Sequence, residues 1–153
     1  MDYLALLTDG FAFGLASTAV MTVLQSFYWG RWGLTGVLEW HENQVIWSRV
    51  KNSNPSVLSP FGIFSLHFLN GGLAGAPFPL VVAAVPVLGL IPLPALGAVY
   101  GVLLWLLTLA LIHKSITGVS IINHQQGFAP VAVSLFGHFV YGISLSVLAS
   151  GML

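Results

Sequence analysis

The chain has 153 residues, of which 57% are hydrophobic and only 5% are charged. So few charges cannot cover the surface of a water-soluble domain of this size, and the composition therefore predicts an integral membrane protein. Four basic residues balance four acidic ones, which excludes nucleic-acid binding because that function needs clustered Lys and Arg. The absence of Cys excludes disulfides, thiolate metal sites and cysteine nucleophiles.

The first apolar stretch, residues 10–29, has about the 20 residues that a spanning helix needs, and it holds no charge. Before it, Asp2 and Asp9 stand where a secretory signal would carry Lys or Arg. We therefore expect a retained helix rather than a cleaved signal.

Residues 33–59 are the only part of the chain rich in charge, and they cannot span a membrane. Apolar residues recur there at near-helical spacing, which predicts an amphipathic helix in the membrane interface between the first two spans. Glu39, His41 and Glu42 are metal-ligand types, but on a helix His41 points about 100° away from Glu42. We expect a solvated interfacial helix and no metal site.

From Pro60 to Ile112 no residue is charged, and this run must hold two spans joined by a turn. Prolines interrupt helical hydrogen bonding, so they place the turn and also a kink near Pro77. A broken half-helix within residues 77–94 is the alternative, since such elements occur at ion sites of transporters. The four predicted spans are residues 10–29, 60–83, 95–113 and 130–150.

Positive charges predict the orientation, because cytoplasmic loops carry an excess of Lys and Arg. The basic residues are Arg31, Arg49, Lys51 and Lys114. Loops 30–59 and 114–129 are therefore predicted to face the cytoplasm, with both termini on the opposite side of the membrane.

Two histidines, His67 and His138, lie in matching apolar stretches, SPFGIFSLHFLNGG and APVAVSLFGHFVYGIS. Each follows a proline by seven or eight residues and has a glycine four residues on. The match predicts an all-α, four-helix bundle made of two parallel helical-hairpin repeats. At the helical rise, each imidazole lies about 10–12 Å into the membrane and faces the bundle interior, with Thr22 or Gln25 as its hydrogen-bond partner.

Several interpretations of this histidine pair stay open. Each imidazole can serve packing through one hydrogen bond to a neighbouring helix. The pair can instead ligate the iron of a b-type haem, or another tetrapyrrole such as a chlorin. A third interpretation is quinone or proton handling, with Tyr141 on the same helical face as His138. A transport site is the fourth.

Small and polar residues at helical spacing predict the faces on which the helices pack. One stripe of the first helix is polar and faces other helices, and it consists of Thr18, Thr22 and Gln25. Glycines four residues apart favour close helix approach, and they occur as the pairs Gly10 with Gly14, Gly71 with Gly75, and Gly97 with Gly101.

The stretch GHFVYGISL, with GAVYGVLLWLL before it, resembles the repeated Gly-His-x-x-Tyr-Gly pattern of small, functionally uncharacterised four-helix membrane proteins of prokaryotes. Gly14, Thr18 and Met21 resemble the first helix of those proteins. The first repeat departs from the pattern, with Leu66 and Asn70 where Gly and Tyr would stand. The resemblance implies four spans in a prokaryotic cytoplasmic membrane, and it implies no activity.

We expect no catalysis by this chain alone, because it shows no carboxylate pair within a span, no nucleophile with a base and no phosphate-binding loop. Its small size favours an accessory subunit of a larger energy-transducing complex, respiratory or photosynthetic, with bound lipid and other membrane subunits as partners. The alternatives are an electron-transfer protein that binds a tetrapyrrole or a quinone through His67 and His138, and a small transporter.

Overall fold

A computed structural model describes residues 2–153, and within that range the protein is helical with no strand. Four helical stretches are long and apolar enough to cross a membrane, which confirms the all-α, four-span fold of an integral membrane protein. These stretches are Tyr3–Trp32, Pro60–Ala84, Leu93–Thr117 and Ala129–Ala149.

The first span, α1 (Tyr3–Trp32), begins before the predicted residue 10 because Asp2 caps it. The Oδ1 atom of Asp2 accepts hydrogen bonds from the backbone N–H groups of Leu4 and Ala5, both at 3.1 Å. A capping carboxylate satisfies N–H groups that have no partner within the helix. The local cap thus extends the helix over a segment that its hydropathy left outside the span.

The second span is made of α3 (Pro60–Gly75) and α4 (Pro77–Ala84), interrupted at the predicted Pro77. A 3-10 turn, Pro86–Leu90, then leads to the third span. That span comprises α5 (Leu93–Trp105), a π-helical turn (Leu106–Ala110) and the short α6 (His113–Thr117). The fourth span is the single helix α7 (Ala129–Ala149).

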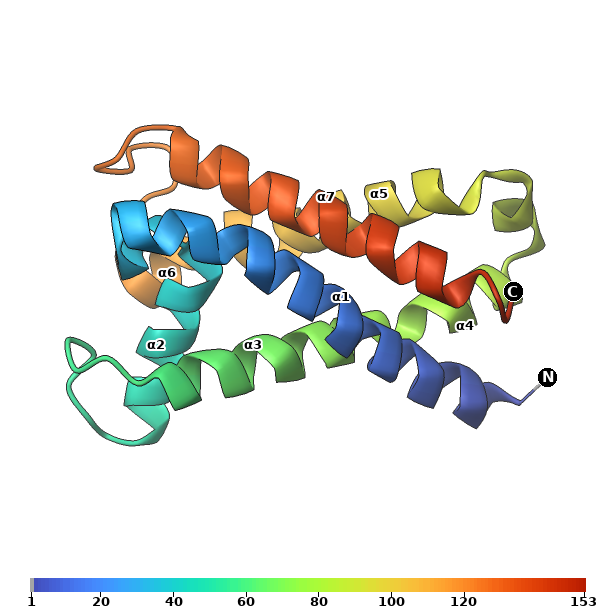
Figure 1. The fold of residues 1–153 in the computed structure, drawn as a ribbon, viewed down its shortest axis with the longest axis horizontal. Coiled ribbons are helices and arrows are strands. Elements are labelled where there is room, and N and C mark those ends of the chain that lie inside the picture. Colours follow the sequence, from blue (N-terminus) through green and yellow to red (C-terminus); the bar gives the residue numbers. More distant parts are fainter. Residues whose placement is uncertain (1) are drawn as a thin grey trace.

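The helices pair closely at two crossings, α1 on α3 and α5 on α7, and the contact of α1 with α7 joins the two pairs (Figure 1). A Cβ at Gly14 would overlap the carbonyl oxygen of Gly71, and a Cβ at Gly101 would overlap that of His138. All six glycines of the predicted pairs lie at these crossings, where Gly97 and Gly101 meet Gly142. The pairings match the two hairpins that the proposed repeat would form, while the repeat itself stays a prediction.

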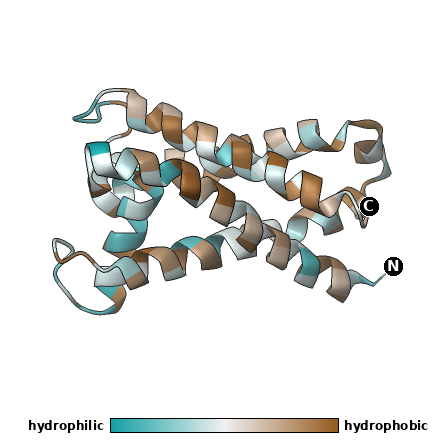
Figure 2. Cartoon of the chain, in the orientation of Figure 1, coloured by the Kyte–Doolittle hydropathy of each residue, from teal (hydrophilic) through white to brown (hydrophobic). Residues whose placement is uncertain are grey.

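The two ends of the bundle differ in composition. Both termini lie at one end with the connection between α4 and α5, while α2 (Leu38–Val50) and α6 lie at the other (Figure 1). Hydrophilic residues gather at the α2 end, as Figure 2 shows. This arrangement puts both charged loops at one end, as the topology prediction requires, and which side of the membrane they face stays a prediction.

Helix α2 differs from the solvated amphipathic helix that its sequence predicts. Glu39 and Glu42 are each only 7% exposed, whereas Val50 is 70% exposed. The expectation of solvated charges is therefore wrong for these two carboxylates. The physical reason is that neighbouring helices supply hydrogen-bond partners to the polar face of α2, so that this face turns inward.

Candidate functional site

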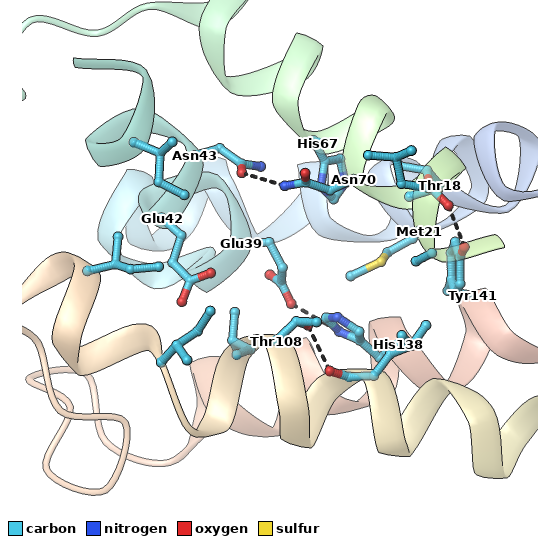
Figure 3. A pocket seen from close by; sticks show the side chains of 18 of the residues that line it. Thr18, Met21, Glu39, Glu42, Asn43, His67, Asn70, Thr108, His138 and Tyr141 are labelled. Carbon is cyan, nitrogen blue, oxygen red and sulfur yellow. Dashed lines mark hydrogen bonds and ion pairs between the residues drawn. The ribbon is translucent and has the colours of Figure 1, made fainter. Parts of the chain in front are cut away.

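A cavity of about 540 Å³ lies between α1, α2, α3, α5 and α7 near the hydrophilic end of the bundle (Figure 3). Much of its lining is apolar, including Met21, Leu104 and Leu109. The polar side chains that line it are Thr18, Glu39, Glu42, Asn43, His67, Asn70, Tyr100, Thr108, His138 and Tyr141. An apolar chamber with a few convergent polar groups is typical of small-molecule sites.

Glu39 is a buried carboxylate with several hydrogen-bond donors around it. Its Oε2 atom accepts from Gln25 Nε2 at 2.8 Å, and its Oε1 atom accepts from the hydroxyl of Ser134. His138 Nδ1 lies 3.3 Å from the same Oε1. Burial alone would raise the pKa of Glu39, but the hydrogen bond and charge of His138, together with Ser134, lower it below its ordinary value. The side chain is therefore held as a carboxylate.

The neighbours of His138 determine which of its nitrogens holds the proton. Nδ1 lies 3.1 Å from the carbonyl oxygen of Ser134 and 3.3 Å from the Glu39 carboxylate. Both neighbours are acceptors, so Nδ1 must be the N–H. This fixes the ring orientation and leaves Nε2 without a role in these contacts.

His67 has no such partner. The residue is 6% exposed, and its Nε2 atom has no hydrogen-bond partner within residues 2–153. The ring lies edge-on to Trp40, with centroids 6.3 Å apart, and also edge-on to Phe68 at 6.1 Å. A buried imidazole nitrogen with no partner is unusual, and here it belongs to a residue that lines the cavity.

A second carboxylate and histidine pair lies beside the first. Glu42 Oε1 is 3.1 Å from Nδ1 of His113, a fully buried histidine, and Glu42 also lines the cavity. Burial raises the pKa of Glu42, and the hydrogen bond to His113 offsets part of this effect. The ring of His113 lies edge-on to that of His41, with centroids 5.8 Å apart. Burial, then the charges of His113 and His124, lower the pKa of His41 to about 4.

Two tyrosines tie the helices around the cavity. Tyr141 donates its hydroxyl hydrogen to the carbonyl oxygen of Gly71 at 2.6 Å, and Tyr100 donates to that of Ala74 at 2.5 Å. Both acceptors lie on α3, in the stretch where glycines expose the backbone. The Tyr141 hydroxyl is thus engaged with a neighbouring helix, and its ring forms part of the cavity wall.

The cavity opens on the side of the bundle, between α3 and α5. Leu73 on α3 is 58% exposed, and Ile112 beyond the π-helical turn is 41% exposed, although both line the cavity. Thr108 in the π-helical turn is exposed as well. These residues belong to the second and third spans, so the opening faces the region that lipid tails occupy around a membrane protein.

His67, His138 and Tyr141 all line one cavity, and the two histidines have neighbours other than those predicted. The Thr22 hydroxyl donates to the carbonyl oxygen of Thr18 at 2.7 Å, and Gln25 donates to Glu39. Neither residue hydrogen-bonds a histidine, so the expected partnership is wrong.

The sequence reasoning missed three site residues on α2, Glu39, Glu42 and Asn43. Their spacing of three and four residues puts them on one helical face. This shared polar face could have predicted that they meet other helices together. Asn43 accepts a hydrogen bond from Asn70 Nδ2 at 3.3 Å, which joins this face to α3. Within the described chain, no three His, Asp or Glu side chains come together as a metal site would require.

Comparison with known proteins adds no relative: the chain matches no protein-family model, no curated protein and no solved structure. The resemblance of its Gly-His-x-x-Tyr-Gly motif to small prokaryotic membrane proteins therefore stays a prediction. Function has to be argued from the cavity and the residues that line it.

Proposed function

We propose that this protein binds a lipid-soluble molecule with a polar ring, such as a quinone, in the cavity between its spans. The observation that carries the proposal is the buried Nε2 atom of His67, which has no partner in the protein. Leaving such an atom unsatisfied costs about 1–3 kcal/mol. A ligand carbonyl or hydroxyl at this position would recover that cost.

The cavity suits a molecule with one polar end and one apolar end. Most of its polar groups come from α2, α3 and α7, and most of its remaining lining is aliphatic (Figure 3). The opening beside Leu73 and Ile112 lies between two spans, where a bilayer-dissolved molecule would enter without passing through water. A benzoquinone-sized ring would lie at the polar end of the cavity, with its apolar tail toward the opening.

A macrocycle between the two histidines is the alternative ligand. Glu39 contacts Nδ1 of His138 at 3.3 Å, and Figure 3 shows its carboxylate beside the His138 ring. Iron would bind the Nε2 atom of each imidazole, so this carboxylate would stay in place as the partner of Nδ1. Of the two imidazoles, only His67 has a buried nitrogen without a partner among residues 2–153, and one carbonyl or hydroxyl satisfies that atom. We therefore favour a smaller ring over the tetrapyrrole alternative.

The accessory-subunit and transporter interpretations stay predictions. A subunit role in an energy-transducing complex is compatible with a quinone-type ligand, but no contact of residues 2–153 singles out a docking face. A transport role would need the same cavity to open at both ends of the bundle. The ligand-binding proposal is favoured because it explains a particular buried atom.

Binding is testable with a short-chain ubiquinone added to the protein in lipid nanodiscs. Quinones quench tryptophan emission, and the Trp40 ring is 6.3 Å from that of His67, so bound quinone should give saturable quenching. We expect His67→Phe, which keeps a ring against Trp40, to weaken the apparent affinity about tenfold, equivalent to about 1.4 kcal/mol.

The matched control is His124→Phe, which alters a histidine that contacts Thr35 and does not line the cavity. This variant should bind the probe as the native protein does. Trp40→Phe should reduce the saturable component, and Trp105, whose Nε1 donates to Ser134 beside Glu39, accounts for the part that remains. Equal affinity in the native protein and His67→Phe would refute the proposal.

A further inference from the structure

Behind the polar end of the cavity, three titratable side chains follow one another toward the hydrophilic end of the bundle. Glu42 lines the cavity, His113 contacts Glu42 through Nδ1 at 3.1 Å, and the His41 ring lies 5.8 Å from that of His113, centroid to centroid. His41 is half-buried, on the helix that forms this end of the bundle (Figure 2). The series therefore runs from the cavity toward the aqueous end.

Two nitrogen atoms in this series are buried and have no partner in residues 2–153. They are Nε2 of His113, on the ring edge opposite the Glu42 contact, and Nδ1 of His41. The two rings are neighbours, so a single water between them would satisfy both atoms. Neither nitrogen is needed for the packing of α2 against α6.

We propose that Glu42, His113 and His41 form a proton relay that connects the cavity with water at the α2 end of the bundle. That the proton is delivered to a ligand site rests on the ligand-binding function proposed above. The proton transfer itself requires no ligand, because each of its steps joins groups of the protein.

Each step of the relay balances. His41 takes a proton from water at its Nε2 atom and gives the proton on its Nδ1 to Nε2 of His113, directly or through a water between the rings. His113 then releases the proton on Nδ1 to the carboxylate of Glu42. The imidazole ends neutral, with its proton on the other nitrogen, and transfer in reverse or a ring flip resets it. The net change is one proton taken from water and held by Glu42 in the cavity wall.

The two cavity carboxylates differ in a way that suits only Glu42 to receive a proton. Glu39 accepts from Gln25 and Ser134 and faces the N–H of His138, so these donors stabilise its charged form. Glu42 has a single such neighbour, His113. Burial raises the pKa of Glu42, which makes its protonated form accessible at higher pH than usual.

Other ionisable groups act on the relay from the elements around it. Glu39 on α2 and His138 on α7 both influence Glu42 electrostatically, and His124, in the loop before α7, influences His41. Arg49 does not hydrogen-bond the relay residues, and its guanidinium donates to the carbonyl oxygen of Ile116 at 2.6 Å. Among residues 2–153, Glu42 is the hydrogen-bond partner of the His113 ring, and none of these other groups hydrogen-bonds it.

Hydrogen exchange at the Glu42 carboxyl group tests the relay without any ligand. Infrared spectra of the protein in a lipid film would be followed while H2O is replaced by D2O, and the C=O band lost in Glu42→Gln identifies the group. We expect His113→Asn to slow exchange of this band about a hundredfold, because Asn can still donate a hydrogen bond to Glu42 but cannot relay a proton. His41→Phe should slow it similarly.

The control is Thr22→Val, because the Thr22 hydroxyl donates only to Thr18 of its own helix and lines neither the cavity nor the relay, so the Glu42 exchange rate should stay unchanged. Unchanged exchange in His113→Asn or in His41→Phe would overturn the relay and indicate that protons reach Glu42 through the cavity. Absence of a Glu42 band at every pH that the folded protein tolerates would also overturn it. None of these outcomes depends on whether quinone binds.

Discussion

At the crossings of α1 with α3 and of α5 with α7 the helices meet through glycines, whereas around α2 they meet through carboxylates, amides and imidazoles. The first kind of contact brings backbones so close that a single Cβ at Gly14 or Gly101 would overlap a carbonyl oxygen. Such packing supplies dispersion energy and leaves no titratable group. The second kind places two carboxylates out of water.

Both kinds of contact stabilise the bundle, but only the second also supplies groups that can hydrogen-bond a ligand or carry a proton. The glycine crossings set how closely the spans approach each other. The α2 end is costly to build, since buried ionised groups are stable only when hydrogen-bonded. A chain with few charges nevertheless places two of its four acidic residues there. These two carboxylates line the cavity, where they can act on a bound molecule.

Glu39→Ala should have the largest effect on stability. The substitution leaves Gln25, Ser134 and His138 without their common acceptor in a buried position, and we expect a loss of about 3 kcal/mol in the free energy of unfolding. Chemical unfolding in mixed micelles measures it. Glu39→Gln, which keeps an oxygen acceptor, should lose less. If both variants are as stable as the native protein, the polar end does not hold α2 in place.

Gly101→Ala should come next, with a loss of about 2 kcal/mol, because the new Cβ must displace the carbonyl oxygen of His138 and separate α5 from α7. The same unfolding assay applies. Gly89→Ala is the control, since no atom lies within 4 Å of a Cβ built there. Equal stability of the two alanine variants would contradict the close crossing.

The α2 end should also make stability depend on pH through His41. Its pKa is lowered from 6.5 to about 4 in the folded protein, so the unfolded chain takes up a proton first as the pH falls. Stability is therefore complete above pH 6.5 and declines as the pH falls toward 4. His41→Gln should flatten this part of the stability profile. A native profile that is already flat between these values would show that His41 is solvated.

Thr22→Val should have the smallest effect, below about 0.5 kcal/mol. The Thr22 hydroxyl donates to a carbonyl oxygen of its own helix, at Thr18, and contacts neither polar pair. Valine has nearly the same shape. The measurement is the same unfolding curve. A loss of unfolding free energy as large as that of Glu39→Ala would contradict this prediction and would mean that the hydroxyl joins two helices.

The fold could be predicted from the sequence because spanning helices are a local property. Uncharged stretches of the required length set the four spans, and prolines set the break at Pro77. The error at the start of α1 was also local, since the Asp2 cap extends the helix. The glycine pairs predicted the packing faces correctly because glycines four residues apart lie on one side of a helix and let a neighbouring backbone approach closely.

The polar site could be predicted only in part. Two matching histidine stretches pointed to His67 and His138, which line the same cavity. The burial of Glu39 depends on donors 14 and 95 residues away, Gln25 and Ser134, and no spacing within α2 reveals them. An apolar pattern indicates which helical face prefers lipid. Whether the polar face is buried depends on hydrogen-bond partners from other helices, which a local pattern does not show.

The most direct test of the binding proposal is a ¹⁵N NMR spectrum of histidine-labelled protein in lipid, recorded with and without short-chain ubiquinone. His67→Phe assigns the His67 signals, and His124, outside the cavity, is the internal reference. We predict that the probe shifts an imidazole nitrogen signal of His67 and leaves those of His124 unchanged. Unchanged His67 signals at probe concentrations that saturate tryptophan quenching would contradict the account.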